Sequence, residues 1–275
     1  MTAITAETHD PQRVRSNVAR LAVAQALTGA NTAGIFAPGS IVGAAIAPNM
    51  SLATLPLSVY VVGMATGTLP TGWVSRTYGR RVAFLIGTGF GALCGVLAAI
   101  AIILKSFPLF CLATFCGGLY ASVALSYRFA AADGASEAFR PKAISWVLAG
   151  GIFAGVLGPQ LVQWTMDFWA PHLFAASFVV QAVIALVAMA VVSTVHAPRP
   201  AKTDLHRGRP LGQIISQRDF IAAALCGTVA YTMMNLVMTS APLAMRLCGL
   251  PISDSNFGIQ WHIVAMYGPS FFTGS

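Results

Sequence analysis

The chain has 275 residues, of which 56% are hydrophobic and 9% are charged, and its mean hydropathy is +0.73. A soluble domain carries roughly 25% charged residues, so this composition excludes an ordinary soluble fold and predicts an all-α integral membrane protein. The net charge is +8. However, the basic residues lie in short segments between apolar runs, without a basic face or interleaved aromatic residues, which argues against a nucleic-acid partner.

Eight apolar segments follow one another along the chain, and we expect each to form a membrane helix. Glycine and proline inside them are tolerated in a membrane bundle, because neighbouring helices satisfy the freed backbone groups. The expected helices cover residues 17–46, 52–71, 82–104, 107–132, 143–166, 172–194, 219–247 and 257 to the last residue.

The basic residues predict how this bundle is oriented. With the N-terminus in the cytoplasm, all but Lys105 and Arg246 of the 16 Lys and Arg residues fall on the cytoplasmic side. We therefore expect a multi-pass protein of the inner, or cytoplasmic, membrane, in contact with the lipid bilayer. The expected parts are a cytoplasmic tail (1–16), a six-helix lobe (17–194), a cytoplasmic linker (195–218) and the start of a second lobe (219–275).

The segment after the linker repeats features of the first two helices. Asn31 and Asn235 each stand six and seven residues before an Ala-Pro pair, and Thr71-Gly72 has a counterpart in Thr273-Gly274. The two matches are offset by 204 and 202 residues. Six helices, a charged linker and a partial second copy are typical of a two-lobed transporter built from parallel repeats.

The stretch from Gly72 to Arg81 reads GWVSRTYGRR and connects the second and third expected helices. It resembles the G-x-x-x-D-R-x-G-R-R loop of the major facilitator superfamily, with Gly72, Gly79, Arg80 and Arg81 on the pattern. The resemblance implies a six-helix N-terminal lobe followed by the first two helices of a second lobe. Family members typically have twelve helices, so we expect a chain truncated after about eight.

The resemblance also implies a gate at this loop, although Arg76 stands where the family has its aspartate. Arginines here can cap helix ends and pair with carboxylates in one conformational state only. We propose Asp133 as the partner of Arg80 or Arg81, with a solvated loop carboxylate as the alternative. Arg128 is expected to pair or to extend toward the interface. The simpler alternative is that the loop's positive charge only sets the orientation of the helices in the membrane.

Two further sets of residues are singled out. Gly151, Gly155, Gly158 and Pro159 partly match an exporter motif of the family's fifth helix and offer a smooth face for close packing, which ordinary helix packing would also explain. A set of polar residues near helix midpoints or ends is expected to line the solute path, with interhelical hydrogen bonding as the alternative. Its members are Gln25, Asn31, Thr32, Tyr120, Gln160, Asn235 and His262.

Transport of a small-molecule substrate by alternating access is the function that these features favour. Apart from Asp219 at the first position of the seventh, no Asp or Glu lies within the expected spans, so His262 is the one candidate for handling a coupling proton, and a packing role is its alternative. A non-transporting lobe, as a remnant or as the partner of another chain, is the competing hypothesis. No motif of an enzyme, a metal site or a cofactor site is visible.

Overall fold

The structure is a computed structural model that describes residues 11–196 and 211–269. All of the regular elements in these ranges are helices. They are α1 (Pro11–Ile46), η2 (Met50–Leu52), α2 (Leu55–Tyr78), α3 (Arg80–Ile103), α4 (Phe107–Ala124), α5 (Tyr127–Asp133), α6 (Arg140–Thr165), α7 (Ala175–Ser193), α8 (Leu211–Ile215), α9 (Arg218–Leu247) and α10 (Ile252–Tyr267). The all-α fold predicted from composition is therefore confirmed.

The helix boundaries differ from the expected ones mainly in four places. α1 begins at Pro11, six residues before the expected start and within the predicted tail. α2 continues to Tyr78, seven residues beyond the predicted end, and the predicted fourth helix divides into α4 and α5 near Ser126. α10 begins earlier than expected and ends at Tyr267, while the last part of the predicted eighth helix lies outside the described residues. Most of the predicted linker also lies outside them, and its described part contains the short α8.

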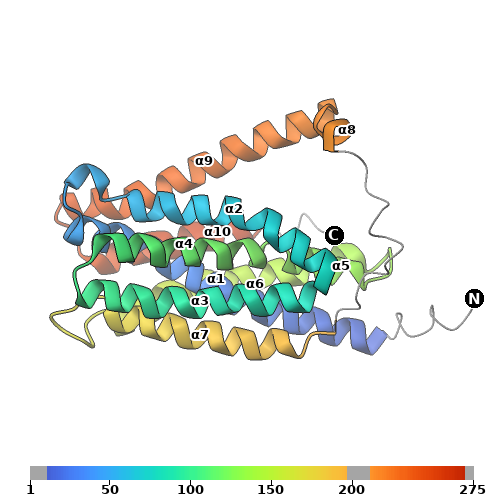
Figure 1. Ribbon diagram of the computed structural model, residues 1–275, viewed down its shortest axis with the longest axis horizontal. Helices are drawn as coiled ribbons and strands as arrows, with labels where there is room; N and C mark the ends of the chain where they lie inside the picture. The colour runs from blue at the N-terminus through green and yellow to red at the C-terminus, as the bar shows by residue number, and fades with distance from the viewer. Residues whose placement is uncertain (1–10, 197–210, 270–275) are drawn as a thin grey trace, which may run out of the picture.

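The long helices lie side by side, and their connections gather at two ends of the bundle (Figure 1). One end holds the start of α1, the α2–α3 turn, α5 and α8; we call it the basic end. The opposite end holds η2 and the α3–α4, α6–α7 and α9–α10 connections; we call it the far end. We call α1 to α7 the first helix group, and α9 with α10 the second.

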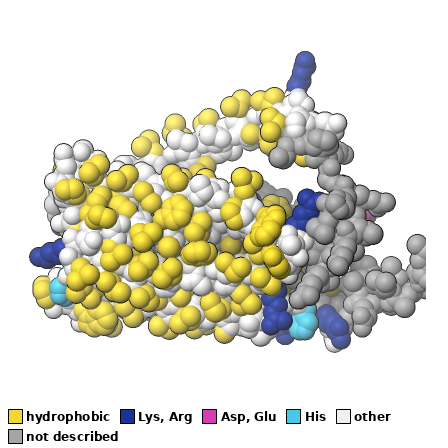
Figure 2. Space-filling model, in the orientation of Figure 1, with side chains coloured by type: hydrophobic (Ala, Val, Ile, Leu, Met, Phe, Trp, Pro, Cys, Tyr) yellow, Lys and Arg dark blue, Asp and Glu magenta, His cyan; other side chains and the backbone are white. Residues whose placement is uncertain are grey.

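The sides of the bundle are apolar. Hydrophobic side chains cover most of the face seen in Figure 2, and the Lys and Arg side chains in this view lie at its ends. Large apolar side chains on the outside of the bundle, such as Leu69 (80% exposed) and Phe153 (65% exposed), would meet water in a soluble protein. Six segments of the described chain are long and apolar enough to cross a membrane; α1 and α10 are not among them but belong to the same bundle. The chain is a multi-pass membrane protein.

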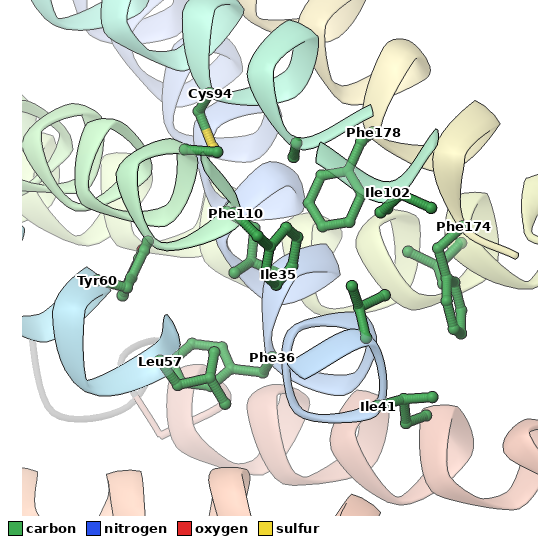
Figure 3. Packing of buried hydrophobic residues seen from close by; sticks show 14 of the residues in the cluster. Ile35, Phe36, Ile41, Leu57, Tyr60, Cys94, Ile102, Phe110, Phe174 and Phe178 are labelled. Atoms are coloured by element: carbon green, nitrogen blue, oxygen red, sulfur yellow. The ribbon is translucent and has the colours of Figure 1, made fainter. Parts of the chain in front are cut away.

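Two clusters of buried side chains form the core. The larger cluster includes Phe110 and Phe178, whose rings meet edge to face with centroids 5.7 Å apart (Figure 3). The same cluster contains Met238 of α9 and Ile263 of α10, so the second helix group packs onto the first. The smaller cluster joins α1, α3, α5, α6 and α7 through residues such as Phe84.

The second helix group meets the first unevenly. Every residue of α9 from Arg218 to Met233 is exposed, whereas Met238 and Pro242, closer to the far end, are buried. α9 runs close to α2 at the far end and separates from it toward the basic end (Figure 1), and the space-filling view is open there (Figure 2). The two groups are thus joined toward the far end and parted toward the basic end.

Candidate functional site

The turn between α2 and α3 consists of one residue, Gly79. Its φ of 92° and ψ of 157° belong to a region that residues with a Cβ atom rarely adopt. The expected loop from residue 72 is therefore corrected: Gly72 and Arg76 lie within the last two turns of α2. The helix continues because nothing after Pro70 interrupts it, and the Trp73 and Tyr78 rings meet edge to face at 5.8 Å along its last turns.

Arg80 starts α3 and binds the carboxylate at the end of α5. Its Nε atom donates a hydrogen bond of 2.7 Å to Asp133 Oδ2, and its Nη2 atom lies 2.5 Å from the same oxygen. The structure thus contains the pair that the sequence suggested, with Arg80 rather than with the exposed Arg81. Both partners belong to the first helix group, so the pair fixes α5 against α3 at the basic end.

Hydroxyl groups of α1 bind tyrosines of α2 and α4 near the centre of the bundle. The Tyr120 hydroxyl donates to Thr28 Oγ1 at 2.8 Å, and the Tyr60 hydroxyl donates to Thr32 Oγ1 at 3.3 Å. Across the gap between the helix groups, the Tyr231 hydroxyl of α9 donates to the sulfur of Met64, one turn beyond Tyr60 on α2, at 3.3 Å. These three tyrosines therefore mark one central region of the bundle, in which Tyr60 and Tyr120 are buried and Tyr231 is exposed.

The two asparagines that the internal repeat pairs do not meet. Asn31 is buried, and its Nδ2 atom donates to the Gln181 carbonyl oxygen of α7 at 2.9 Å, while the Gln181 side chain donates back to the Gly34 carbonyl oxygen at 3.2 Å. Asn235 donates to the Tyr231 carbonyl oxygen of its own helix. This arrangement supports the interhelical alternative for Asn31, because its amide joins α1 to α7.

The other predicted path residues are spread along the bundle. Gln25 is half-buried on α1, toward the basic end, and His262 is half-buried on α10, where its Nε2 atom is buried and has no hydrogen-bond partner among the described residues. Gln160 lies on α6 near the far end. The structure therefore does not gather the predicted set around one point.

An amide cluster near the far end joins α6 to α10. Gln160 Nε2 donates to Gln260 Oε1 at 2.9 Å, and Asn256 Nδ2 donates to Gln163 Oε1 at 3.1 Å. A cavity of about 270 Å³ opens beside these amides. It is lined by Pro159, Gln160, Gln163, Ser253, Asp254, Asn256 and Phe257. Sequence reasoning missed Asn256 and Gln260, although their spacing of four residues puts them on one face of a helix.

The glycines of α6 pack against two different neighbouring helices. A Cβ atom added to Gly151 would lie 2.6 Å from the Tyr267 ring of α10, and one added to Gly155 would lie 2.7 Å from Ile263 Cγ2. A Cβ atom on Gly158 would instead lie 2.8 Å from Ala33 Cβ of α1. The predicted packing residues therefore allow close approach on two faces, one within the first helix group and one toward the second.

No group of three His, Cys, Asp or Glu residues in the described ranges is arranged to hold a metal ion.

Comparison with known proteins identifies the family. The Major Facilitator Superfamily model matches residues 21–274. The riboflavin transporter RfnT of Brucella anthropi is 43% identical over 268 residues, which cover 96% of this chain and 67% of that protein. The uncharacterized MFS-type transporters YdeG and YddS of Bacillus subtilis are 28% and 29% identical, over 87% and 86% of this chain and 60% and 59% of their own lengths. The family resemblance seen in the sequence is confirmed, and the chain belongs to the major facilitator superfamily.

Proposed function

We propose that this chain is a secondary active transporter, a symporter or an antiporter rather than an enzyme, that moves a flavin of the riboflavin type across the cytoplasmic membrane. Its N-terminus lies in the cytoplasm in this proposal, because the basic end carries most of the positive charge. The relatives matched are transporters, and the one at 43% identity is named for riboflavin. The chain spans about two thirds of that relative's length.

The observation that carries the transport mechanism is the uneven contact between the two helix groups. They are joined by buried residues toward the far end, and α9 stands apart from α2 toward the basic end (Figure 1). An arrangement closed at one end and open at the other is one half of an alternating-access cycle. With the basic end in the cytoplasm, this is the inward-open state.

The chemistry of the central region supports a flat, polar heterocycle as the solute. Tyr231 of α9 is exposed in this region, whereas Tyr60 and Tyr120 are buried behind it with their hydroxyl groups bound to Thr32 and Thr28. Aromatic faces stack on a conjugated ring system, and hydroxyl groups bind its carbonyl and ring nitrogen atoms. Thr32 and Asn235 add polar groups on α1 and α9, and Gln25 lies on α1 toward the basic end.

Gating is assigned to the two ends. Gly79 lets the chain turn from α2 into α3 within a single residue. The ion pair of Arg80 with Asp133 holds α5 in place beside that turn. At the far end, the amide cluster of α6 and α10 closes the path with neutral hydrogen bonds. His262 is the residue proposed to take a coupling proton, because its Nε2 atom has no partner among the described residues.

Uptake of radiolabelled riboflavin into proteoliposomes tests this function. We expect time-dependent uptake that excess unlabelled riboflavin abolishes, and that a pH gradient increases. Far-UV circular dichroism and protease protection would establish that the reconstituted protein is folded and inserted. A folded, inserted protein that neither binds nor moves riboflavin would contradict the proposal and favour the alternative of a non-transporting lobe.

A further inference from the structure

Arg128 of α5 carries a charge that no described residue balances. Asp133, the carboxylate on the same helix, binds Arg80. Within residues 11–196 and 211–269 no carboxylate forms an ion pair with Arg128, and its buried Nε atom has no hydrogen-bond partner. The guanidinium carbon lies 5.0 Å from the centre of the neighbouring Phe129 ring. This contact shields the cation without neutralising it.

The packing of α5 on the first helix group fixes the position of Arg128. Tyr127 and Ala131 are buried, and the Tyr127 ring meets Phe84 edge to face at 4.8 Å, which fixes the rotation of α5 about its axis. α5 packs on α6. The Tyr267 ring of α10 packs against Gly151 on the same helix α6. Tyr267 of α10 is within electrostatic range of Arg128. Arg128 therefore lies at the basic end, where α9 stands apart from α2.

An unpaired arginine in this position is costly unless a ligand or another group neutralises it. Its planar fork fits a carboxylate or a phosphate through two parallel hydrogen bonds. The surrounding surface adds attraction for anions, because Arg81, Arg140 and Lys142 are exposed at the same end. An exposed arginine such as Arg81 is satisfied by water, whereas the buried Nε atom of Arg128 is not.

We propose that Arg128 binds an anionic group on the solute, so that the site takes a phosphate monoester of a flavin more tightly than neutral riboflavin. The choice of a flavin as the ring system in this inference rests on the proposed function. The anionic group is inferred from Arg128 alone. The phosphate lies at the basic end of the central region, and the ring extends toward the tyrosines of the two helix groups. Tyr267 of α10, which is within electrostatic range of Arg128, is the hydroxyl group expected to donate to a phosphate oxygen.

Equilibrium titration with two probes tests the inference. Flavin fluorescence would follow binding of riboflavin and of riboflavin 5′-phosphate to the purified full chain in detergent. We expect the phosphate ester to bind about tenfold more tightly, as one charge-assisted contact allows, and the preference to shrink as salt is added. Arg128→Gln should lose the preference and keep its riboflavin affinity within about twofold, because the lost contact is to the phosphate alone.

Two further variants control the result. Arg128→Lys should keep part of the preference, because lysine retains the charge and loses the fork. Arg81→Gln should keep most of it, because this exposed arginine contributes only long-range attraction that water and salt screen. Equal affinity of the wild-type protein for the two probes, or the same loss of preference in Arg81→Gln, would overturn the inference whether or not Arg128→Gln folds.

The outcome also separates this inference from the proposed function. Riboflavin binding without a preference for its phosphate ester would leave the proposed function standing and remove the anion site. Conversely, inorganic phosphate that raises the unfolding temperature of the wild-type protein but not of Arg128→Gln would support the anion site even if riboflavin itself did not bind.

Discussion

Adding one methyl group to Gly155 should open the contact between α6 and α10. The new Cβ atom would lie 2.7 Å from Ile263 Cγ2, about 1 Å inside the normal separation of two carbon atoms. Overpacking of this kind costs about 1–3 kcal/mol. Because α10 belongs to the second helix group, the cost falls on the state in which the two groups touch here. We expect the population of that state to fall by about 5- to 150-fold relative to an opened one.

Gly158 provides the matched control on the same helix. Its added Cβ atom would lie 2.5 Å from the Ala30 carbonyl oxygen and 2.8 Å from Ala33 Cβ, a clash at least as severe, but with α1 inside the first helix group. Gly158→Ala should therefore lower the stability of the first group and leave its contact with α10 intact. For a chain of this size the unfolding temperature falls by about 2–4 °C for each kcal/mol lost.

Cross-linking near the far end measures the α6–α10 contact directly. Gln160→Cys and Gln260→Cys place one thiol on each helix, within reach of a short bifunctional thiol reagent because the longer glutamine side chains now meet at 2.9 Å. The background changes the exposed Cys226 and Cys248 to serine. We expect the cross-linked fraction to drop several-fold in Gly155→Ala and to stay unchanged in Gly158→Ala. A Gly155→Ala protein that cross-links as fully as its parent would refute the reasoning, because α10 would then not move away from α6.

Three smaller predictions concern single side chains. Asp133→Asn and Arg80→Gln should show a coupling of about 0.2–1 kcal/mol in a double-mutant cycle on unfolding stability, since Asp133 is 60% exposed; strictly additive effects would show that the pair does not stabilise the turn. Tyr120→Phe should destabilise the protein by about 1 kcal/mol in thermal unfolding, because it removes a buried hydrogen bond to α1, whereas Tyr78→Phe, at an exposed position, should not. His262→Gln should remove the stimulation of riboflavin uptake by a pH gradient and preserve riboflavin exchange; full stimulation in this variant would exclude the proton role.

The sequence predicted the helices and their order because each long apolar run satisfies its backbone hydrogen bonds only as a helix in a membrane. It also predicted a glycine-containing turn between the second and third helices, and the structure narrows this turn to Gly79, since glycine accepts a positive φ at no steric cost. It did not locate the end of α2, because the residues from Gly72 to Tyr78 are polar enough for a loop and are equally compatible with a helical turn at the bundle's end.

Side-chain partners were harder to predict than helices. Asn31 and Asn235 hold equivalent places in the internal repeat, but Asn31 lies beside α7 and binds its backbone, whereas Asn235 binds its own helix. An internal repeat identifies equivalent positions in the two copies. It does not identify which helix packs beside each position. The amides Asn256 and Gln260 were missed for the same reason, because their partners on α6 are known only once α6 and α10 are seen to run antiparallel.

α6 shows why relative motion is expected at one of its faces and not at the other. Toward α1, Gly158 brings backbone against backbone inside a buried core, and such contacts tolerate little displacement. Toward α10, the amides of Gln160 and Gln163 end the contact with hydrogen bonds, each worth about 0.6 kcal/mol in a membrane protein. Both bonds together cost about 1 kcal/mol to break, and the freed amides can bind water when the far end opens. The first helix group can therefore move as one body while α10 separates from it, and a solute bound between them would decide which end is open.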